Sequence, residues 1–338
     1  MAKNAILVCQ APVEIPNILC FYEEIKNRYK DITIVSRDTN SYNEFFQYIG
    51  LEANFVRWSN DYRFDALNPF TWIAFRKQIK ENVDKLKIDN VDVFYSSRYD
   101  FFSYCHFKQF PLSTTFTYRD KKDSEVWCYK GTNKASFKVS IKRKLEKFIK
   151  QCFCGTKLEY YNCGAHSILG FNPQNLRHTI KKKLSDTEEK SIIQKYSYKP
   201  HTNSKYTAIF FTEPYRNKFQ DSNDFISVNK TIISELHKKG YAIILKGHPR
   251  IGLCKEIEHL ADDIIPNFIP SEFIDYNEFN IAIGFVSTAL CGTSQIIPSY
   301  SVLDLCSITD KRLAEHWRQF LNELSNNKIV FINSFSDI

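Results

Sequence analysis

The chain has 338 residues and a net charge of +8, with 43% apolar and 25% charged residues. The length predicts two domains, and the composition is that of a globular protein and excludes a disordered one. The mild basic excess suits an anionic partner such as a phosphate, a nucleotide sugar, an acidic lipid or a nucleic acid, without choosing among them.

The N-terminal segment and the cysteines predict an intracellular protein with reduced thiols. No signal peptide and no apolar run long enough to cross a bilayer is found, so we expect a cytoplasmic protein or one peripheral on the inner membrane face. The ten cysteines should then carry no disulfide. Cys152, Cys154, Cys163 and His166 are of zinc-ligand type, but the first pair is spaced more tightly than structural zinc pairs, so we expect no metal site.

Strand-like and helix-like segments alternate through the first half of the chain. The expected strands are 5–9, 33–36, 53–58, 91–95 and 114–118. The expected helices are 13–29, 42–49, 69–86 and 100–107. Such alternation predicts a parallel sheet covered by helices on both faces.

The segment 134–151 is strongly basic, with seven Lys or Arg residues and a single acid. Its apolar residues Phe137, Ile141, Leu145 and Phe148 recur at helical spacing. Two interpretations stay open: an ordinary surface helix with a solvated face, or an interfacial helix that holds the protein on anionic lipid.

A polar region at 186–205 is expected to be a linker that follows an N-terminal domain, 1–185, and precedes a C-terminal domain, 206–338. Expected strands of the second domain are 206–211, 241–246, 280–285, 303–306 and 328–332. Expected helices are 224–239, 270–276 and 311–324. The predicted fold class is therefore α/β, with two Rossmann-like domains of parallel strands, and no internal repeat of fixed period is visible.

In such folds a ligand binds beyond the carboxyl ends of the strands, so residues that follow strands are candidates for the site. Glu213 follows the strand 206–211 and is a candidate general base. A turn carboxylate is the alternative role for it.

At the end of the strand 241–246 a lysine, a histidine and an arginine lie close together around a proline. Lys246, Gly247, His248, Pro249 and Arg250 follow one another there. Pro249 restricts the residue before it, so His248 should be held extended. A histidine fixed beside cations can contact a phosphate and donate a proton to it.

A third strand end carries two hydroxyls, Ser287 and Thr288, just before an expected helix start. Side-chain hydroxyls and backbone amides at that point suit an anion, and the same pattern is also that of a simple N-cap.

Several of these segments resemble motifs of bacterial sialyltransferases, most closely glycosyltransferase family 52, the lipooligosaccharide sialyltransferases. Residues 246–250 resemble the HP motif, and 285–290 resemble the downstream Ser/Thr motif. Segments 164–169, 172–176 and 209–214 resemble other pieces of the family in the same order. The likeness covers about two thirds of the chain.

The resemblance implies a GT-B fold and an inverting, metal-free transfer from CMP-sialic acid to a glycan acceptor, typically a terminal galactose. No cofactor is implied, and a homodimer is compatible with it. It implies that His248 contacts the CMP phosphate and acts as the acid for the leaving group, and that Ser287 and Thr288 hold the same phosphate. Glu272 takes the place of an acid that binds the cytidine ribose.

Two departures from the family pattern concern the general base. The Asp-Asp-Gly motif should fall near 114–123, where the chain has Tyr118-Arg-Asp120 instead. The catalytic aspartate of the family would fall at Tyr215. We therefore rank Glu213 first and Asp120 second as candidate bases.

Other functions remain open at this stage. The donor could be Kdo, another nonulosonate or a hexose, transferred by a GT-B enzyme. A non-catalytic nucleotide-binding or nucleic-acid-binding protein, or an inactive relative that binds donor alone, is a further alternative. The chain lacks a P-loop, a G-x-G-x-x-G motif and zinc fingers of correct spacing, so we expect no nucleic-acid partner.

Overall fold

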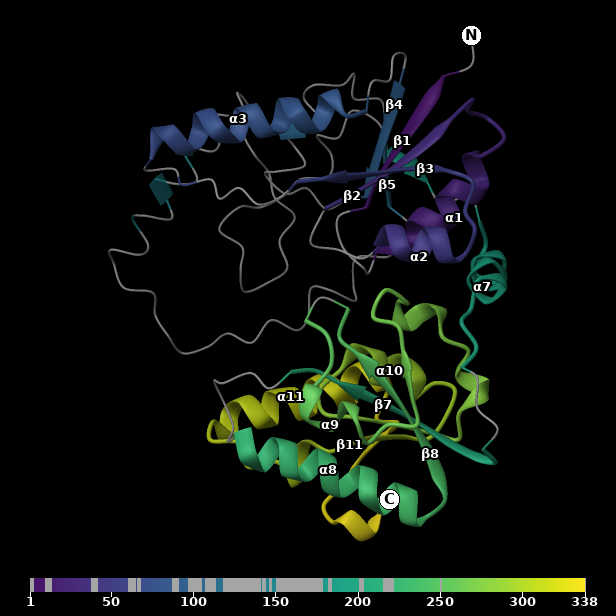
Figure 1. The fold of residues 1–338 in the computed structure, drawn as a ribbon, viewed down its shortest axis with the longest axis vertical. Helices are drawn as coiled ribbons and strands as arrows, with labels where there is room; N and C mark the ends of the chain where they lie inside the picture. Colours follow the sequence, from purple (N-terminus) through teal and green to yellow (C-terminus); the bar gives the residue numbers. More distant parts are fainter. Residues whose placement is uncertain are drawn as a thin grey trace. The chain divides into compact units, whose positions relative to one another are not determined.

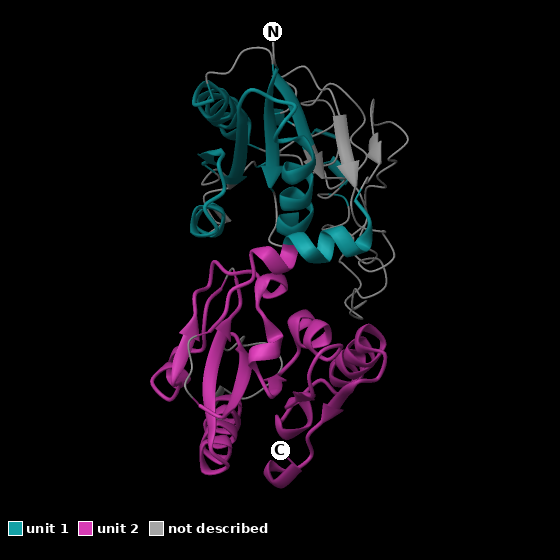
Figure 2. Ribbon diagram, turned by 90° about the vertical axis from the view of Figure 1, so that its right-hand side faces the viewer, with its two compact units in different colours: residues 1–192 teal, residues 193–338 magenta. Residues whose placement is uncertain are grey.

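The structure is a computed structural model in which the chain forms two compact units, 1–192 and 193–338 (Figure 2). The border lies within helix α7, Asp186–Lys195, in the segment expected to be a linker. The structure describes residues 3–9, 14–37, 42–59, 65, 68–86, 91–96, 105–106, 114–117, 141, 144–145, 148–149, 179–181, 184–200, 204–214, 222–249 and 251–337.

The first unit contains a six-stranded parallel sheet in the order β3-β2-β1-β4-β5-β6 (Figure 1). In chain order its strands are β1 Asn4–Cys9, β2 Ile32–Arg37, β3 Asn54–Trp58, β4 Val91–Ser96, β5 Thr114–Thr117 and β6 Thr179–Lys181. Its helices include α1 Ile15–Ile25, α2 Tyr42–Tyr48 and α3 Pro69–Asp84. Parallel pairing requires crossovers, and α1, α2 and α3 supply those that connect β1, β2, β3 and β4.

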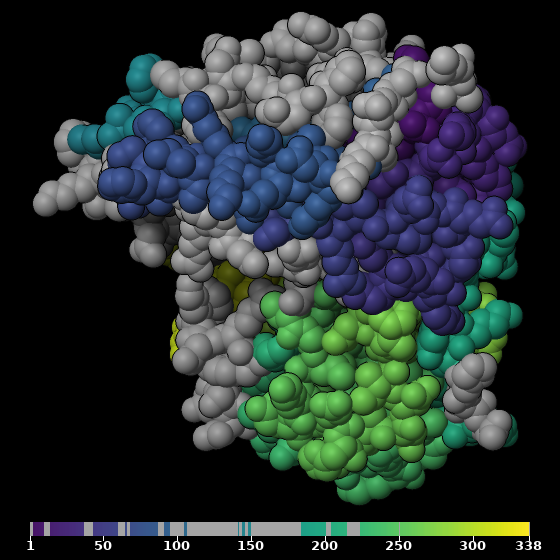
Figure 3. Space-filling view, turned by 45° about the horizontal axis from the view of Figure 1, so that its top comes forward, coloured from purple at the N-terminus to yellow at the C-terminus, as the bar shows by residue number. Residues whose placement is uncertain are grey.

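The core of this unit forms around β1, whose last five residues are buried. Helix α1 covers the sheet with an apolar face, and the ring of Phe21 lies 5.0 Å from that of Phe94 on β4. Helix α3 begins where the side chain of Asn68 accepts a hydrogen bond from Phe70 N–H. This helix lies at the surface as a continuous ridge, coloured blue in Figure 3.

The second unit contains another six-stranded parallel sheet, in the order β12-β11-β10-β7-β8-β9. In chain order its strands are β7 Tyr206–Thr212, β8 Tyr241–Gly247, β9 Asp263–Ile265, β10 Ile281–Gly284, β11 Ser299–Ser301 and β12 Ile329–Phe331. Its helices are α8 Ser222–Lys238, α9 Lys255–Glu258, α10 Thr288–Thr293 and α11 Lys311–Ser325. The 3-10 turns are η4 Ser271–Phe273, η5 Tyr276–Glu278, η6 Leu303–Leu305 and η7 Phe335–Asp337.

Alternate residues of the central strands serve opposite faces of this second sheet. Phe210 and Leu245 pack in one core cluster with the apolar residues of α8. The helix ends just before Gly240, which has the left-handed φ of 82° that favours glycine. On the opposite face the ring of Phe211 lies 6.4 Å from that of Tyr276 in η5. Lys246 of β8 pairs with Phe211 and therefore lies on the same face, near Glu272 of η4.

The predicted fold class, α/β with two Rossmann-like parallel sheets, is confirmed by these strand orders. Counted from the first strand of each unit, both sheets have the order 3-2-1-4-5-6 that is known from dinucleotide-binding folds. The two halves thus repeat one topology although their sequences show no repeat.

Some predicted elements were wrong. The strand expected at 303–306 is the 3-10 turn η6, and the strand of that region is β11, whose buried serines lack an apolar pattern. The helix expected at 270–276 is divided into η4 and η5. The backbone between them is extended because Tyr198 pairs with Ile274. The three-residue strands β6 and β9 were not predicted.

Candidate functional site

The candidate site lies at the carboxyl edge of the second sheet. Strand β7 sits between β10 and β8, and the chain connects outward in opposite directions from β7 and β10, which makes their junction the topological switch point. Thr212 pairs with Gly247, and Phe211 pairs with Gly284, so these three strands end at nearly the same level. Glu213, His248 and Ser287 are therefore supplied by neighbouring strand ends.

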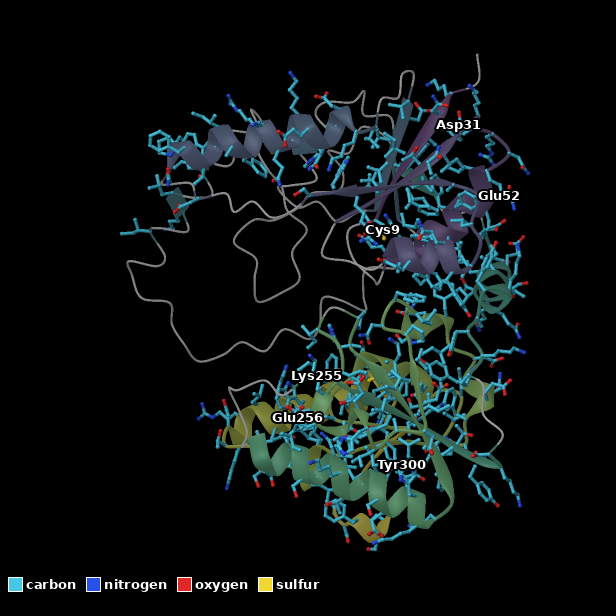
Figure 4. All side chains as sticks on the ribbon, viewed as in Figure 1. Cys9, Asp31, Glu52, Lys255, Glu256 and Tyr300 are labelled. Atoms are coloured by element: carbon cyan, nitrogen blue, oxygen red, sulfur yellow. The ribbon has the colours of Figure 1, made fainter. Side chains whose placement is uncertain are left out.

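His248 begins a tight turn that its own backbone closes. Its N–H donates to the carbonyl of Gly252 at 3.0 Å, and the N–H of Gly252 donates back to the carbonyl of His248 at 2.8 Å. Gly252 has φ 85°, a conformation that favours glycine. The side chain of His248 is half-buried. The turn holds the histidine backbone in place before the chain enters α9, whose first residues Lys255 and Glu256 are labelled in Figure 4.

Gly247 is needed for close packing under this turn. A Cβ atom at Gly247 would lie 2.5 Å from Oδ1 of Asn267, 2.9 Å from the carbonyl carbon of Gly252 and 3.0 Å from Cδ2 of Leu253. The turn after β8 and the segment after β9 are therefore packed against each other at this point, with no room for a side chain.

Lys246 lies inside the strand, with 3% of its surface exposed, and not in the turn that follows. Its Nζ donates to the carbonyl of Gly247 at 3.1 Å and to those of Pro266 and Asn267 at 3.5 Å each. Burial lowers the pKa of Lys246 to about 8, and the nearby Glu272 carboxylate opposes that effect. Lys246 thus connects the two segments that meet at Gly247 and places a titratable amine beneath them.

Glu272 and Tyr276 line the same face. Glu272 is exposed on η4, where its Oε2 accepts a hydrogen bond from Ser271 Oγ at 3.1 Å. Tyr276 donates its hydroxyl to the carbonyl of Ser271 at 2.7 Å. Burial, and secondly the Glu272 carboxylate, hold the pKa of Tyr276 well above its usual range. Tyr276 is therefore a neutral packing and positioning group, whereas the Glu272 carboxylate faces solvent.

Ser287 is the N-cap of α10. Its Oγ accepts a hydrogen bond from Ala289 N–H at 3.2 Å, which uses a lone pair and not the hydroxyl proton. The neighbouring Thr288 is exposed. A Cβ on Gly284 would lie 3.3 Å from Phe211 Cβ, so β10 and β7 are closely packed just below these hydroxyls.

Thr212 is a polar residue of this strand end that the sequence did not lead us to expect. It is the last residue of β7 and directly precedes the half-buried Glu213. Thr212 is buried, and among the described residues its Oγ1 is one of the buried polar atoms without a hydrogen-bond partner. A hydroxyl residue that directly follows the apolar run 208–211 and precedes a candidate base was the available signal.

Other predicted features lie outside the described residues. These are Asp120, Arg250, the cluster Cys152, Cys154, Cys163 and His166, and most of the helix expected at 134–151. Within the part of the chain that the structure describes, no three His, Cys, Asp or Glu side chains gather as a metal site. The six cysteines described there form no disulfide and are buried. No helix in the described segments is long and apolar enough to cross a membrane.

Comparison with known proteins gives likenesses of fold. No protein-family profile matches the chain, and no curated protein matches it in sequence. The UDP-GlcNAc 2-epimerase of Neisseria meningitidis, solved with UDP-GlcNAc, is 9% identical over 98% of this chain and 95% of its own, with a TM-score of 0.46. The E. coli heptosyltransferase WaaC, solved with an ADP-heptose analogue, is 10% identical over 99% and 95%, with a TM-score of 0.43.

A third solved structure, MurG of Acinetobacter baumannii, is 11% identical over 99% of this chain and 87% of its own, with a TM-score of 0.36. The strand order of the two sheets, and not these alignments, carries the assignment of the fold.

Proposed function

We propose that the chain is a GT-B-type glycosyltransferase that uses a nucleotide-sugar donor, and that this donor is CMP-sialic acid. The acceptor would be a terminal sugar, galactose in the resembled family, of a bacterial lipooligosaccharide, O-antigen or capsule. The proposal is supported by the shared strand order of the two units and by the polar residues at the switch point between β7 and β10. It is also supported by the resemblance of 246–250 and 285–290 to family 52 motifs.

The observation that carries the proposal is the position of His248. It follows β8 beside the end of β7, and its backbone is fixed by two hydrogen bonds to Gly252. A preorganised donor at the place where negative charge develops is worth about 3 kcal/mol in transition-state stabilisation. We assign to the imidazole of His248 the hydrogen bond to the departing CMP phosphate and the delivery of a proton to it.

Further groups would stabilise the same phosphate. Ser287 and Thr288 would donate their hydroxyls, and Ser287 can do so while it caps α10. Lys246 would act through its charge from beneath the site, because its amine is occupied by backbone carbonyls.

Glu272, exposed on η4, would accept hydrogen bonds from the ribose. Gly247, Pro249 and Arg250 would shape the phosphate-binding turn, and with these contacts no divalent metal is required.

The proposed transfer is a single displacement at the anomeric carbon. The acceptor hydroxyl oxygen forms the new bond as the bond from the anomeric carbon to the phosphate oxygen breaks, and CMP leaves with the electron pair. Attack on the face opposite the phosphate inverts the anomeric carbon, and a carboxylate takes the proton of the hydroxyl. Glu213, half-buried directly after β7, is the first candidate for this base, and Asp120 is the second.

Calorimetric titration with CMP, UMP, GMP and AMP in the presence of EDTA tests the donor class. We expect selective binding of CMP that is weakened in His248→Ala and unchanged in His259→Ala, which removes an exposed histidine at the end of α9. Selective binding of another nucleotide would be consistent with a nucleotide-sugar transferase but would contradict CMP-sialic acid as the donor. Absence of binding to any nucleotide would contradict the transferase itself.

A further inference from the structure

We propose that the N-terminal half of α3 is a docking surface for an anionic lipid bilayer. Two large apolar side chains at its start, Phe70 and Ile73, are 79% and 69% exposed. They are the two most exposed large apolar side chains of the described residues. They lie three positions apart and therefore on one side of the helix, within the surface ridge of Figure 3.

The chemistry of the residues that follow indicates which surface would cover this apolar end. Arg76, Lys77 and Lys80 are exposed in the next two turns. Lys77 and Lys80 lie four and seven positions after Ile73, on the same side of the helix. Lys77 approaches Glu81 at 3.8 Å, an exposed pair that leaves it accessible to other anions.

An apolar edge followed by cations on one helix face matches the boundary between acyl chains and anionic headgroups, where lysine stems reach outward to the phosphates. Trp72 stands beside these residues, half-buried, with its Nε1 donating to the carbonyl of Asp65 at 3.0 Å. A tryptophan at such a boundary is typical of interfacial helices. The net charge of +8 adds long-range attraction to an anionic surface.

A second exposed apolar stripe in the same unit has the same character. The described residues Ile141, Leu145 and Phe148 are helical and exposed, and Lys144 beside them is exposed as well. Their spacing places them on one helix face. The first unit therefore carries two apolar and basic helical stripes, and α3 is the one whose whole length the structure describes.

Vesicle co-sedimentation of the full chain, without substrate, tests the proposal. The probes are vesicles of phosphatidylcholine alone and of an equimolar mixture with phosphatidylglycerol, each at low and high salt. We expect binding to the mixed vesicles that weakens at high salt. Phe70→Ser combined with Ile73→Ser should lower the partition coefficient by roughly tenfold or more, and Lys77→Gln combined with Lys80→Gln by roughly 30-fold.

The matched control is Ile296→Ser combined with Val330→Ser, which removes two exposed apolar side chains, 55% and 53% exposed, from the second unit. Unchanged circular dichroism confirms that each variant is folded, and the control should bind vesicles like the wild type. Equal binding of the Phe70 and Ile73 variant and the wild type would overturn the proposal, as would equal binding to neutral and anionic vesicles. A concentration-dependent dimer that the same variant dissociates would assign the surface to a second copy of the chain instead.

Discussion

Replacing Lys246 by methionine should change how the stability of the protein depends on pH. Lys246 is 3% exposed, and burial lowers its pKa from the ordinary value of 10.5 to about 8. The unfolded chain keeps the proton up to the ordinary pKa, whereas the folded chain releases it near pH 8. Between these values unfolding takes up a proton, so stability rises with pH. The destabilisation is complete below the folded pKa and is relieved above the unfolded one.

The magnitude follows from the two pKa values. One pKa unit corresponds to about 1.4 kcal/mol, so the fall from 10.5 to about 8 corresponds to about 3.4 kcal/mol. Most of this is recovered within an accessible range, about 2.5 kcal/mol from about pH 7 to about pH 10. A methionine of similar length does not titrate, so the free energy of unfolding of the wild type should rise by this amount relative to Lys246→Met.

Urea unfolding of both proteins across this pH range measures the difference, because contributions from all other titrating groups cancel. Lys239→Met, which removes an exposed lysine of the same unit, is the control and should show no such trend. Carbon-13 NMR of lysine Cε gives the pKa directly, since the resonance absent from Lys246→Met is that of Lys246. A stability difference that does not vary with pH, or a Lys246 resonance that titrates near 10.5, would refute the reasoning.

Three further predictions concern the site. His248→Ala should lower turnover by roughly a hundredfold or more while thermal unfolding is unchanged, and retained turnover would remove His248 from the mechanism. Gly247→Ala should lower the stability of the second unit by about 1–3 kcal/mol in urea unfolding, because the new Cβ would meet Gly252 and Asn267, and an unchanged midpoint would contradict that packing. EDTA should leave turnover intact, and inhibition that one divalent ion reverses would contradict a metal-independent transfer.

Much of the candidate site could be read from local sequence because each of its segments follows a buried strand. Glu213, His248 and Ser287 each follow an apolar run, and parallel strands bring their carboxyl ends to one edge. Local sequence did not predict an element that lacks an apolar pattern of its own. The strand β11 consists of Ser299, Tyr300 and Ser301, and it is a strand because β10 and β12 pair with it on both sides.

The sequence by itself determined the α/β class, the alternation of strands and helices in each half, and the polar residues that follow the central strands, because apolar periodicity and turn residues act over a few neighbours. Only the tertiary structure decided that the two sheets share one strand order, that Lys246 is buried against the carbonyls of Pro266 and Asn267, and that Gly247 has no room for a Cβ. Each of these features involves segments that are far apart in the sequence, such as Gly247 and Asn267, which hydrophobic packing and strand pairing bring together and no single segment encodes.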